Sequence, residues 1–161
     1  MKKNKIYNDK NIKPKEIIEL YISVGWGIKD EYDEPSIRIM IFNTSSIFYC
    51  RNEKGKLIGM VRIFSDFIVT TYIAEIIVRP EYQKKGIGKY LIETVIRKFK
   101  NTGIYLDTLP GIEGFAEKCG FKKQKNMSVF SKKVKLISAF SFLPFASAFT
   151  FSPVFSPHNH R

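Results

Sequence analysis

The sequence predicts an α+β fold, an α/β sandwich in which helices flank a mixed central sheet. Three observations predict it. Residues 70–78 form an almost wholly apolar run, as expected for a strand that is covered on both faces. Segments 46–51 and 57–64 read as strands separated by a Glu-Lys-Gly turn, the pattern of a β-hairpin. From Ile87 onward, apolar residues recur with helical spacing. A chain of 161 residues suits one domain with a single core.

Two helices are expected before the hairpin. A short edge strand near Ile6 and Tyr7 precedes them, and Pro14 suits the first turn of the first helix. The Gly25-Trp26-Gly27 segment ends that helix, and a second short helix is expected from Pro35 to about Phe42. The apolar stripe of the first helix is formed by Ile17, Leu20, Tyr21 and Val24.

Helices and strands alternate after the central strand. Pro80 has no backbone N–H and therefore ends the strand, and the next helix runs to about Lys98. Residues 104–109 are expected to form a strand, followed by a short helix to Cys119 with Gly120 as its C′ residue. The sheet is expected to be completed by two further strands, Phe121–Lys125 and Met127–Lys133.

The loop between the central strand and its helix has the composition of an anion site. Gly86 and Gly88 allow positive φ and a close approach to the backbone, while Lys84 and Lys85 add positive charge. Amides of the loop and of the first helical turn would point at one spot, where the helix dipole favours negative charge. The expected ligand is a phosphate or pyrophosphate, and the alternative is an ordinary turn. A dinucleotide-binding Rossmann motif is disfavoured because the third glycine is missing.

The charge balance favours anionic partners. The 27 Lys and Arg residues outnumber 15 Asp and Glu residues, which gives a net charge of +12. The lysines are scattered and are not interleaved with aromatic residues, so DNA binding is not expected and RNA binding is a weak alternative. Cys50 and Cys119 offer neither a disulfide framework nor metal-ligand spacing. The basic N-terminus lacks the apolar stretch of a secretory signal, so a cytoplasmic location is the default expectation.

Residues 136–161 differ in composition from the rest of the chain. This Phe-, Ser- and Pro-rich tail is expected to lie outside a domain formed by residues 1–135. Three interpretations compete: a membrane anchor, a segment for association with a partner or a second copy of the chain, and a non-native end. Pro144, Pro153 and the many serines disfavour the membrane anchor.

The loop and its flanks closely resemble motif A of the GCN5-related N-acetyltransferases (GNAT), whose signature is Q/R-x-x-G-x-G/A. That signature reads Gln83-Lys84-Lys85-Gly86-Ile87-Gly88, and the Val-x-Pro-x-Tyr lead-in reads Val78-Arg79-Pro80-Glu81-Tyr82. A second family block, F-Y-E-K-x-G-F, reads Phe115-Ala116-Glu117-Lys118-Cys119-Gly120-Phe121. The looser resemblance extends from about Ile17 to Lys133. It implies the GNAT acyltransferase fold, with a bulged central strand and a splayed central strand pair.

The resemblance also implies the cofactor, acetyl-coenzyme A, and a site for it. Pyrophosphate contacts would carry over to the loop, and the pantetheine arm would pair with the end of the central strand as an added strand does. A backbone N–H near Val78 would polarise the thioester carbonyl. The cofactor-binding residues implied in this way are Ile77, Val78, Arg79, Gln83, Lys84, Lys85, Gly86, Ile87, Gly88, Lys89, Phe115 and Lys118.

The expected reaction is direct attack by a primary amine of a small molecule or peptide, with no covalent enzyme intermediate. Glu75, Tyr72 and Tyr105 are the candidate catalytic residues, and Asp66, Asp107 and Glu113 are further candidates for the base. Strand alternation predicts that Tyr72 and Val78 share one face while Glu75 lies on the other, where it could bond to a helix. A homodimer is a further expectation for the enzyme.

Ala116 departs from the family pattern, because many members carry a tyrosine there as the general acid. Alanine cannot donate a proton, so the alternative function is an acyl-coenzyme A sensor or partner protein with little or no turnover. Acceptor choice is expected to depend on the region from Trp26 to Ile39. There Trp26 and Tyr32 either line an acceptor pocket or belong to the core. The nearby acids either attract a cationic amine or are solvated, and they are Asp30, Glu31, Asp33 and Glu34.

Overall fold

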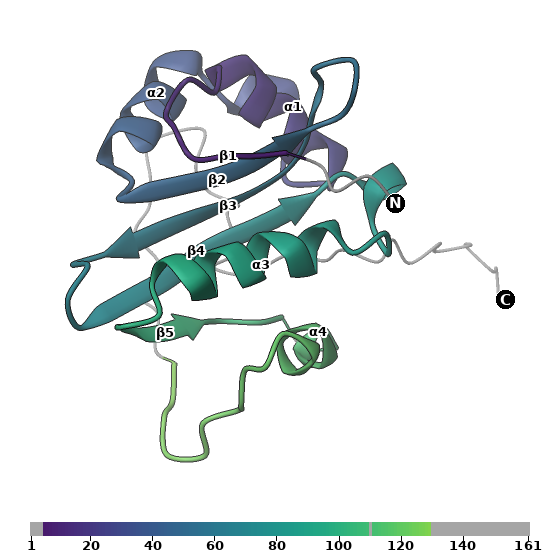
Figure 1. Ribbon diagram of the computed structural model, residues 1–161. Helices are drawn as coiled ribbons and strands as arrows, with labels where there is room; N and C mark the ends of the chain where they lie inside the picture. Colours follow the sequence, from purple (N-terminus) through teal and green to yellow (C-terminus); the bar gives the residue numbers. More distant parts are fainter. Residues whose placement is uncertain (1–4, 110, 130–161) are drawn as a thin grey trace, which may run out of the picture.

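The fold was obtained as a computed structural model, which describes residues 5–109 and 111–129 (Figure 1). Its helices are α1 (Pro14–Ser23), α2 (Glu34–Asn43), α3 (Ile87–Lys98) and α4 (Glu113–Lys118), with short 3-10 turns at Lys29–Glu31 and Pro80–Tyr82. Its strands are β1 (Ile6–Tyr7), β2 (Ser46–Arg51), β3 (Leu57–Ser65), β4 (Thr70–Val78) and β5 (Gly103–Leu106).

The strands form one mixed sheet in the order β1-β2-β3-β4-β5. Strands β1 to β4 pair antiparallel, whereas β5 runs parallel to β4. A bulge interrupts the β3–β4 ladder, since Arg62 pairs with Glu75 but Ile63 pairs with Ile73, which leaves Ala74 as the extra residue. The predicted bulge is therefore confirmed. The pairing of β4 with β5 ends at Ile73 and Leu106, so residues 74–78 of β4 lie beyond it.

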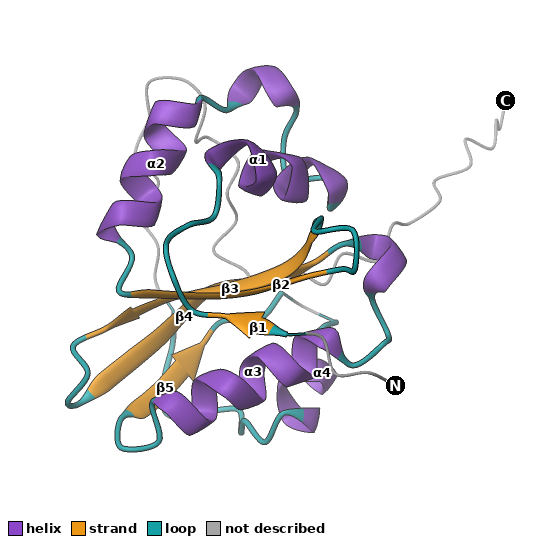
Figure 2. Cartoon of the chain, turned by 45° about the horizontal axis from the view of Figure 1, so that its top comes forward, coloured by secondary structure: helices purple, strands orange, loops and turns teal. Residues whose placement is uncertain are grey.

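Helices cover both faces of the sheet (Figure 2). Helices α1 and α2 lie on one face, and α3 and α4 lie on the other. Residues of β4 alternate between two apolar clusters, because Ile77 packs in the cluster under α1 and α2 while Ile76 and Val78 pack in the cluster under α3. A Cβ at Gly59 on β3 would lie 3.1 Å from the Ile77 carbonyl oxygen, which is tight, and in ordinary contact, at 3.4 Å, with Ile87 and Leu91 of α3.

The strand expected at residues 121–125 is not formed, and the second expected strand is described only in part. Residues 121–125 and 127–129 contain no strand, and residues 130–133 lie outside the described part of the chain. The segment after Phe121 reads Lys-Lys-Gln-Lys-Asn, which has no alternating apolar face to bury and is rich in residues that strands disfavour. Strand β5 also ends at Leu106 instead of the expected Leu109.

The tail, residues 136–161, lies outside the described residues. The three alternatives for its role therefore stay predictions. Within the described part of the chain, none of the helices combines the length and the hydropathy that crossing a bilayer requires.

Candidate functional site

The loop after β4 presents amides that the described protein leaves unused. Tyr82 and Gln83 donate their backbone N–H groups to the carbonyls of Arg79 and Pro80, at 2.8 and 3.1 Å. The first bond of α3 runs from the Tyr90 N–H to the Gly86 carbonyl, at 2.9 Å. Between them, the N–H groups of residues 85–89 have no acceptor within the described ranges. These are the unpaired donors of a helix N-terminus, where the dipole favours an anion.

Gly86 gives this loop its shape. Its φ of +80° places it in the left-handed region, which a glycine adopts without strain, and it caps α3. A Cβ at Gly86 would meet no atom within 4 Å, so the space beside the amides is open. Lys84 shares the left-handed conformation with a φ of 58°. The loop is thus open toward solvent on the side where an anion would bind.

The lysines of the loop are placed around its rim. Lys85 donates through Nζ to the Glu81 carbonyl at 2.8 Å and lies over the Tyr82 ring. Lys89 forms a weak surface ion pair with Glu93 at 3.9 Å, and its side chain is 56% exposed. Because these contacts are at the surface, either ammonium group can reorient toward a bound phosphate at small cost.

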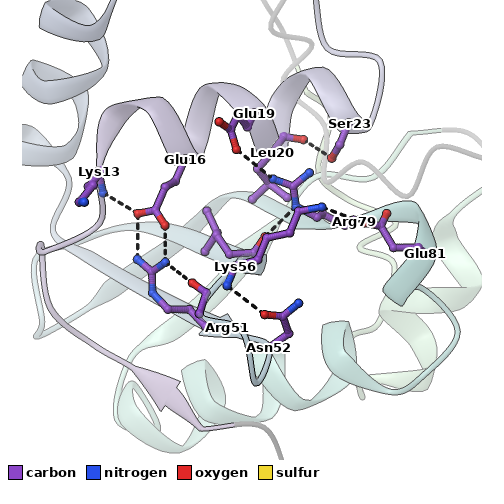
Figure 3. Close-up of polar contacts among 12 residues, drawn as sticks. Lys13, Glu16, Glu19, Leu20, Ser23, Arg51, Asn52, Lys56, Arg79 and Glu81 are labelled. Atoms are coloured by element: carbon purple, nitrogen blue, oxygen red, sulfur yellow. Dashed lines mark hydrogen bonds and ion pairs between the residues drawn. The ribbon is translucent and has the colours of Figure 1, made fainter.

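Gln83 and Arg79 hold the loop to the sheet. Gln83 Nε2 donates to the Val78 carbonyl at 2.9 Å, which folds the loop back onto the end of β4. Arg79 is buried; its Nε donates to the Leu57 carbonyl at 2.7 Å, and its guanidinium lies 3.8 Å from Glu19 of α1 (Figure 3). The Arg79 N–H donates to the Ile58 carbonyl. Arg79 therefore ties α1 to the sheet beside the loop.

The end of β4 offers a backbone edge beyond the end of its pairing with β5. The Arg79 N–H faces β3, and N–H directions alternate along a strand. The N–H groups of Ile76 and Val78 therefore point to the opposite side, past the end of the β4–β5 pairing. An extended ligand lying beside residues 76–78 would meet this backbone edge of β4.

Glu75 lies in a buried polar network and is only 3% exposed. Its Oε1 accepts a hydrogen bond of 2.6 Å from the Tyr21 hydroxyl of α1, and its Oε2 accepts one of 3.2 Å from Arg62. Arg62 Nε lies 3.0 Å from Glu75 Oε1. It makes no hydrogen bond, so this contact is an ion pair only. Burial, together with the charge of Glu75, raises the pKa of Tyr21 well above its usual value. Both oxygens of Glu75 are thus occupied by protein groups.

The bulge changes which residues share a face. Tyr72 pairs with Phe64, and Arg62, two residues before Phe64, pairs with Glu75, so Tyr72 and Glu75 lie on the same face. The expectation that they lie on opposite faces is wrong, because the extra residue Ala74 shifts the alternation by one. The Tyr72 hydroxyl donates to Asp107 Oδ2 at 2.6 Å. Burial and this bond raise the pKa of Tyr72.

Tyr105 lies beside Tyr72, because the two residues are partners in the parallel β4–β5 ladder. Its ring is 44% exposed and folds over Gly103. The remaining candidates for the base are occupied near the surface. Asp66 accepts backbone hydrogen bonds from Ile68, Val69 and Thr70, and Glu113 accepts one from Gly111.

The second sequence block forms α4. Phe115 and Phe121 are partly buried and pack against the cluster under α3, and the buried Cys119 belongs to that cluster. Ala116 is buried, whereas Lys118 is exposed. Gly120 has a φ of +90° and ends the helix, as its position predicted.

The residues expected to determine which acceptor binds are largely buried or hydrogen-bonded to other groups of the protein. Trp26 is 4% exposed and belongs to the core, where it packs against Tyr21 at a ring distance of 5.5 Å. Tyr32 donates through its hydroxyl to the Trp26 carbonyl, and burial raises its pKa to about 12. Asp33 caps α2 by accepting from the Ser36 N–H, and Glu31 accepts from the Ile28 N–H.

The sequence analysis did not predict that Tyr21 and Arg62 are the partners of Glu75. The sequence did offer a signal for Arg62, because a charged residue within an otherwise apolar hairpin strand is expected to have a polar partner. Tyr21 had none, because a tyrosine on the apolar stripe of a helix is expected to be core.

A family model and the curated relatives of the chain both indicate the same family. A model of the Acetyltransferase (GNAT) family matches residues 14–121. The chain is 33% identical over 103 residues to an uncharacterized N-acetyltransferase ycf52 from Gracilaria tenuistipitata var. liui, covering 62% of this chain and 56% of that protein. It is 30% identical over 122 residues to the protein of the same name from Pyropia yezoensis, covering 72% and 68%. The chain thus spans between about half and two thirds of these relatives.

Solved structures agree on the fold. A probable acetyltransferase from meticillin-resistant Staphylococcus aureus, SA2161, matches with a TM-score of 0.68 and 20% identity, over 81% of this chain and 100% of that one. AAC(6')-Iy, solved in complex with the bisubstrate analog CoA-S-monomethyl-acetylneamine, matches with a TM-score of 0.61 and 16% identity, over 82% and 99%. At these identities the likeness concerns the fold alone.

Proposed function

Because the chain belongs to the Acetyltransferase (GNAT) family, we propose that it transfers the acetyl group of acetyl-coenzyme A to a primary amine. The observation that carries this proposal is the loop of residues 83–89. Its amides at positions 85–89 have no acceptor in the described part of the chain, and the left-handed Gly86 leaves the space beside them open. A diphosphate fits such a site.

The residues present fit coenzyme A along its length. Amides of residues 85–89 would hold the diphosphate, with Lys84, Lys85 and Lys89 around it. The edge of β4 at Ile76 and Val78 would pair with the extended pantetheine arm. Phe115 and Lys118, implied by the family block, lie on α4, where Phe115 is partly buried against the core and Lys118 is exposed. Acetyl-coenzyme A would supply the acetyl group as a thioester, which an amine can attack directly.

Direct attack in a ternary complex is supported by the state of the cysteines. Cys50 and Cys119 are both buried, and burial raises the pKa of Cys50 to about 12 and raises that of Cys119 as well. Neither thiol is poised as a thiolate nucleophile. A backbone N–H of β4, near Val78, would instead polarise the carbonyl that the amine attacks.

Proton transfer is assigned by elimination among the candidate side chains. Glu75 is buried with both oxygens occupied, so we assign it a structural role that holds α1 to the sheet. Tyr72 and Tyr105 lie side by side where β4 and β5 part, and Asp107 is bonded to Tyr72. The base would act through this group, directly or through water.

A second function is favoured by one observation. Ala116, at the position of the usual general acid, is buried in α4 and has no proton to give. Loss of general acid catalysis costs about 10²- to 10⁴-fold in rate. An acyl-coenzyme A-binding protein with trace turnover is therefore the alternative.

The test is acetyl transfer to a panel of primary amines, read by mass spectrometry of the products. An acetylated amine whose formation requires both the chain and acetyl-coenzyme A supports the enzyme. Coenzyme A binding without any product would favour the binding protein. Absence of both would contradict the two functions together.

A further inference from the structure

The turn between β3 and β4 carries three consecutive apolar side chains that are exposed to solvent. Phe67, Ile68 and Val69 are 55%, 74% and 67% exposed, and they are called the apolar tip below. Soluble proteins avoid such a run on their surface unless it has a role. The apolar tip lies at the end of the sheet opposite to the loop after β4 (Figure 1).

Side-chain hydrogen bonds hold the apolar tip in one conformation. Asp66 Oδ1 accepts the N–H groups of residues 68–70, at 2.8 to 2.9 Å. Ser65 Oγ accepts the Phe67 N–H at 2.9 Å. Phe67 has a φ of 63°, in the left-handed region, which is strained for an aromatic residue. The fold therefore maintains a strained turn that keeps its apolar side chains exposed.

The N–H groups of the turn are prepared for removal from water. Each one from Phe67 to Thr70 donates to an oxygen of the turn itself, and the Val69 carbonyl accepts from the Gly103 N–H at 2.8 Å. An unpaired N–H is costly in lipid, where no water replaces the missing partner. The apolar tip can thus enter an apolar phase without leaving its N–H groups unpaired.

Basic residues lie beside the base of the apolar tip. The Phe67 ring packs on the Phe99 ring, with the centroids 5.6 Å apart. Lys98 and Lys100 flank Phe99 at the C-terminal end of α3. Both lysines are exposed, and neither has a hydrogen-bond or ionic partner in the described part of the chain. Their ammonium groups are therefore available to an anionic surface.

The size and the charge of this region indicate what covers the apolar tip. Residues 96–104 contain three cations and no carboxylate, and the carboxylate of residues 63–72 is that of Asp66, which binds the turn amides. Three apolar residues are far fewer than the about 20–30 that each partner contributes to a stable protein–protein interface. A bilayer needs no matching surface, and a few inserted apolar side chains with nearby cations suffice for reversible binding.

We propose that the apolar tip inserts into the interface of an anionic lipid bilayer, where Lys98 and Lys100 contact the lipid headgroups. The loop after β4, at the other end of the sheet, then faces away from the bilayer and stays open to its ligand (Figure 1). The inference depends on the β3–β4 turn and the end of α3, and not on the proposed acetyl transfer.

The experiment is sedimentation of the full chain with vesicles of phosphatidylcholine alone and of phosphatidylcholine mixed equally with phosphatidylglycerol. Wild type, Ile68→Ser and Ile28→Ser are compared, and thermal unfolding checks that the variants fold. Ile28 is the matched control, because it is 63% exposed in the connection between α1 and α2. Ile68→Ser should bind the anionic vesicles at least about fivefold more weakly than the wild type, and Ile28→Ser should bind them like the wild type.

A second comparison tests the charge. The double variant Lys98→Gln with Lys100→Gln should bind anionic vesicles at least about tenfold more weakly, whereas Lys15→Gln with Lys54→Gln should lose less than about threefold. The control lysines are exposed and lie in α1 and in the β2–β3 turn. The wild type should prefer anionic over neutral vesicles at least about tenfold.

Each of three results would overturn the proposal: no binding of wild type to anionic vesicles, equal binding to both vesicle types, or equal losses in a variant and its control. Light scattering of the chain without lipid tests a second copy as the occupant. We expect the same mass for wild type and Ile68→Ser. A dimer that Ile68→Ser dissociates would assign the apolar tip to a second copy and would also overturn the proposal.

Discussion

The polar groups beside α1 and those at the N-terminus of α3 differ in whether they have hydrogen-bond or ionic partners within the described protein. On the α1 side they satisfy one another: Glu75 is bonded to Tyr21 and Arg62, Glu16 is bonded to Arg51, and Arg79 bonds to the Leu57 carbonyl and pairs with Glu19. At the start of α3, the amides of residues 85–89 have no acceptor in the described residues. In the first region the charged groups are paired with one another, although Arg62 Nε makes an ion pair without a hydrogen bond. In the proposed function, an external anion binds the amides of the second region.

This contrast separates structural residues from binding residues. A buried charge that is fully paired is costly to break but has no capacity left for a ligand. An open glycine loop at a helix N-terminus contributes little to folding but can bind phosphate oxygens. Substitutions on the α1 side should therefore change stability, and substitutions in the loop should change cofactor affinity.

The largest effect is expected for Glu75→Ala. The substitution leaves Arg62 as an unpaired buried cation and removes the acceptor of the Tyr21 hydroxyl, so the free energy of unfolding should fall by about 3–5 kcal/mol. Urea unfolding measures it. Glu75→Gln, which keeps the shape and an acceptor for Tyr21, should lose less. A loss of transfer activity at nearly unchanged stability would instead show that Glu75 is the base.

A smaller effect, on binding, is expected for Gly86→Ala. The side chain strains the left-handed backbone at φ +80° and shifts the loop amides, so coenzyme A should bind at least about tenfold more weakly, about 1.4 kcal/mol. Gly25→Ala is the matched control, because Gly25 has a φ of +78° with equally open surroundings at the end of α1. Both variants should lose similar stability, and only Gly86→Ala should lose affinity. Equal affinities in the two variants would remove the loop from the binding site.

The smallest effect concerns Glu16 and acid. The hydrogen bond from Arg51 lowers the pKa of Glu16 while partial burial opposes it, so this pair stabilises the fold above the unfolded-state pKa near 4.5. The contribution is lost as pH falls through the lower folded-state pKa, and solvent screening limits it to about 1 kcal/mol or less. Between pH 5 and pH 3, the free energy of unfolding should fall less in the Arg51→Met variant than in the wild type. Parallel pH profiles of the two proteins would contradict the coupling.

Most elements of the fold were predictable because their signals are local. Hydrophobic period and turn residues located β2 and β4 at their observed bounds, and α3 at its observed end. The strand expected at residues 121–125 is not formed, because the local residues are lysine-rich and lack an apolar face.

The candidate site was predictable only in part. The glycine loop has a short sequence signature, so its position after β4 could be foreseen. The face of Tyr72 could not be, because the bulge at Ala74 leaves no mark in an apolar strand and reverses the alternation beyond it. The Glu75 network joins α1, β3 and β4, and a contact across such sequence separations has no local signal.

The central claim is that amides of residues 85–89 bind the diphosphate of coenzyme A. Calorimetric titration of the chain with coenzyme A and with pantetheine, which lacks the diphosphate, tests it most directly. The account predicts that coenzyme A binds at least about 100-fold more tightly, as several charge-assisted hydrogen bonds require. Equal affinities for the two ligands would contradict it.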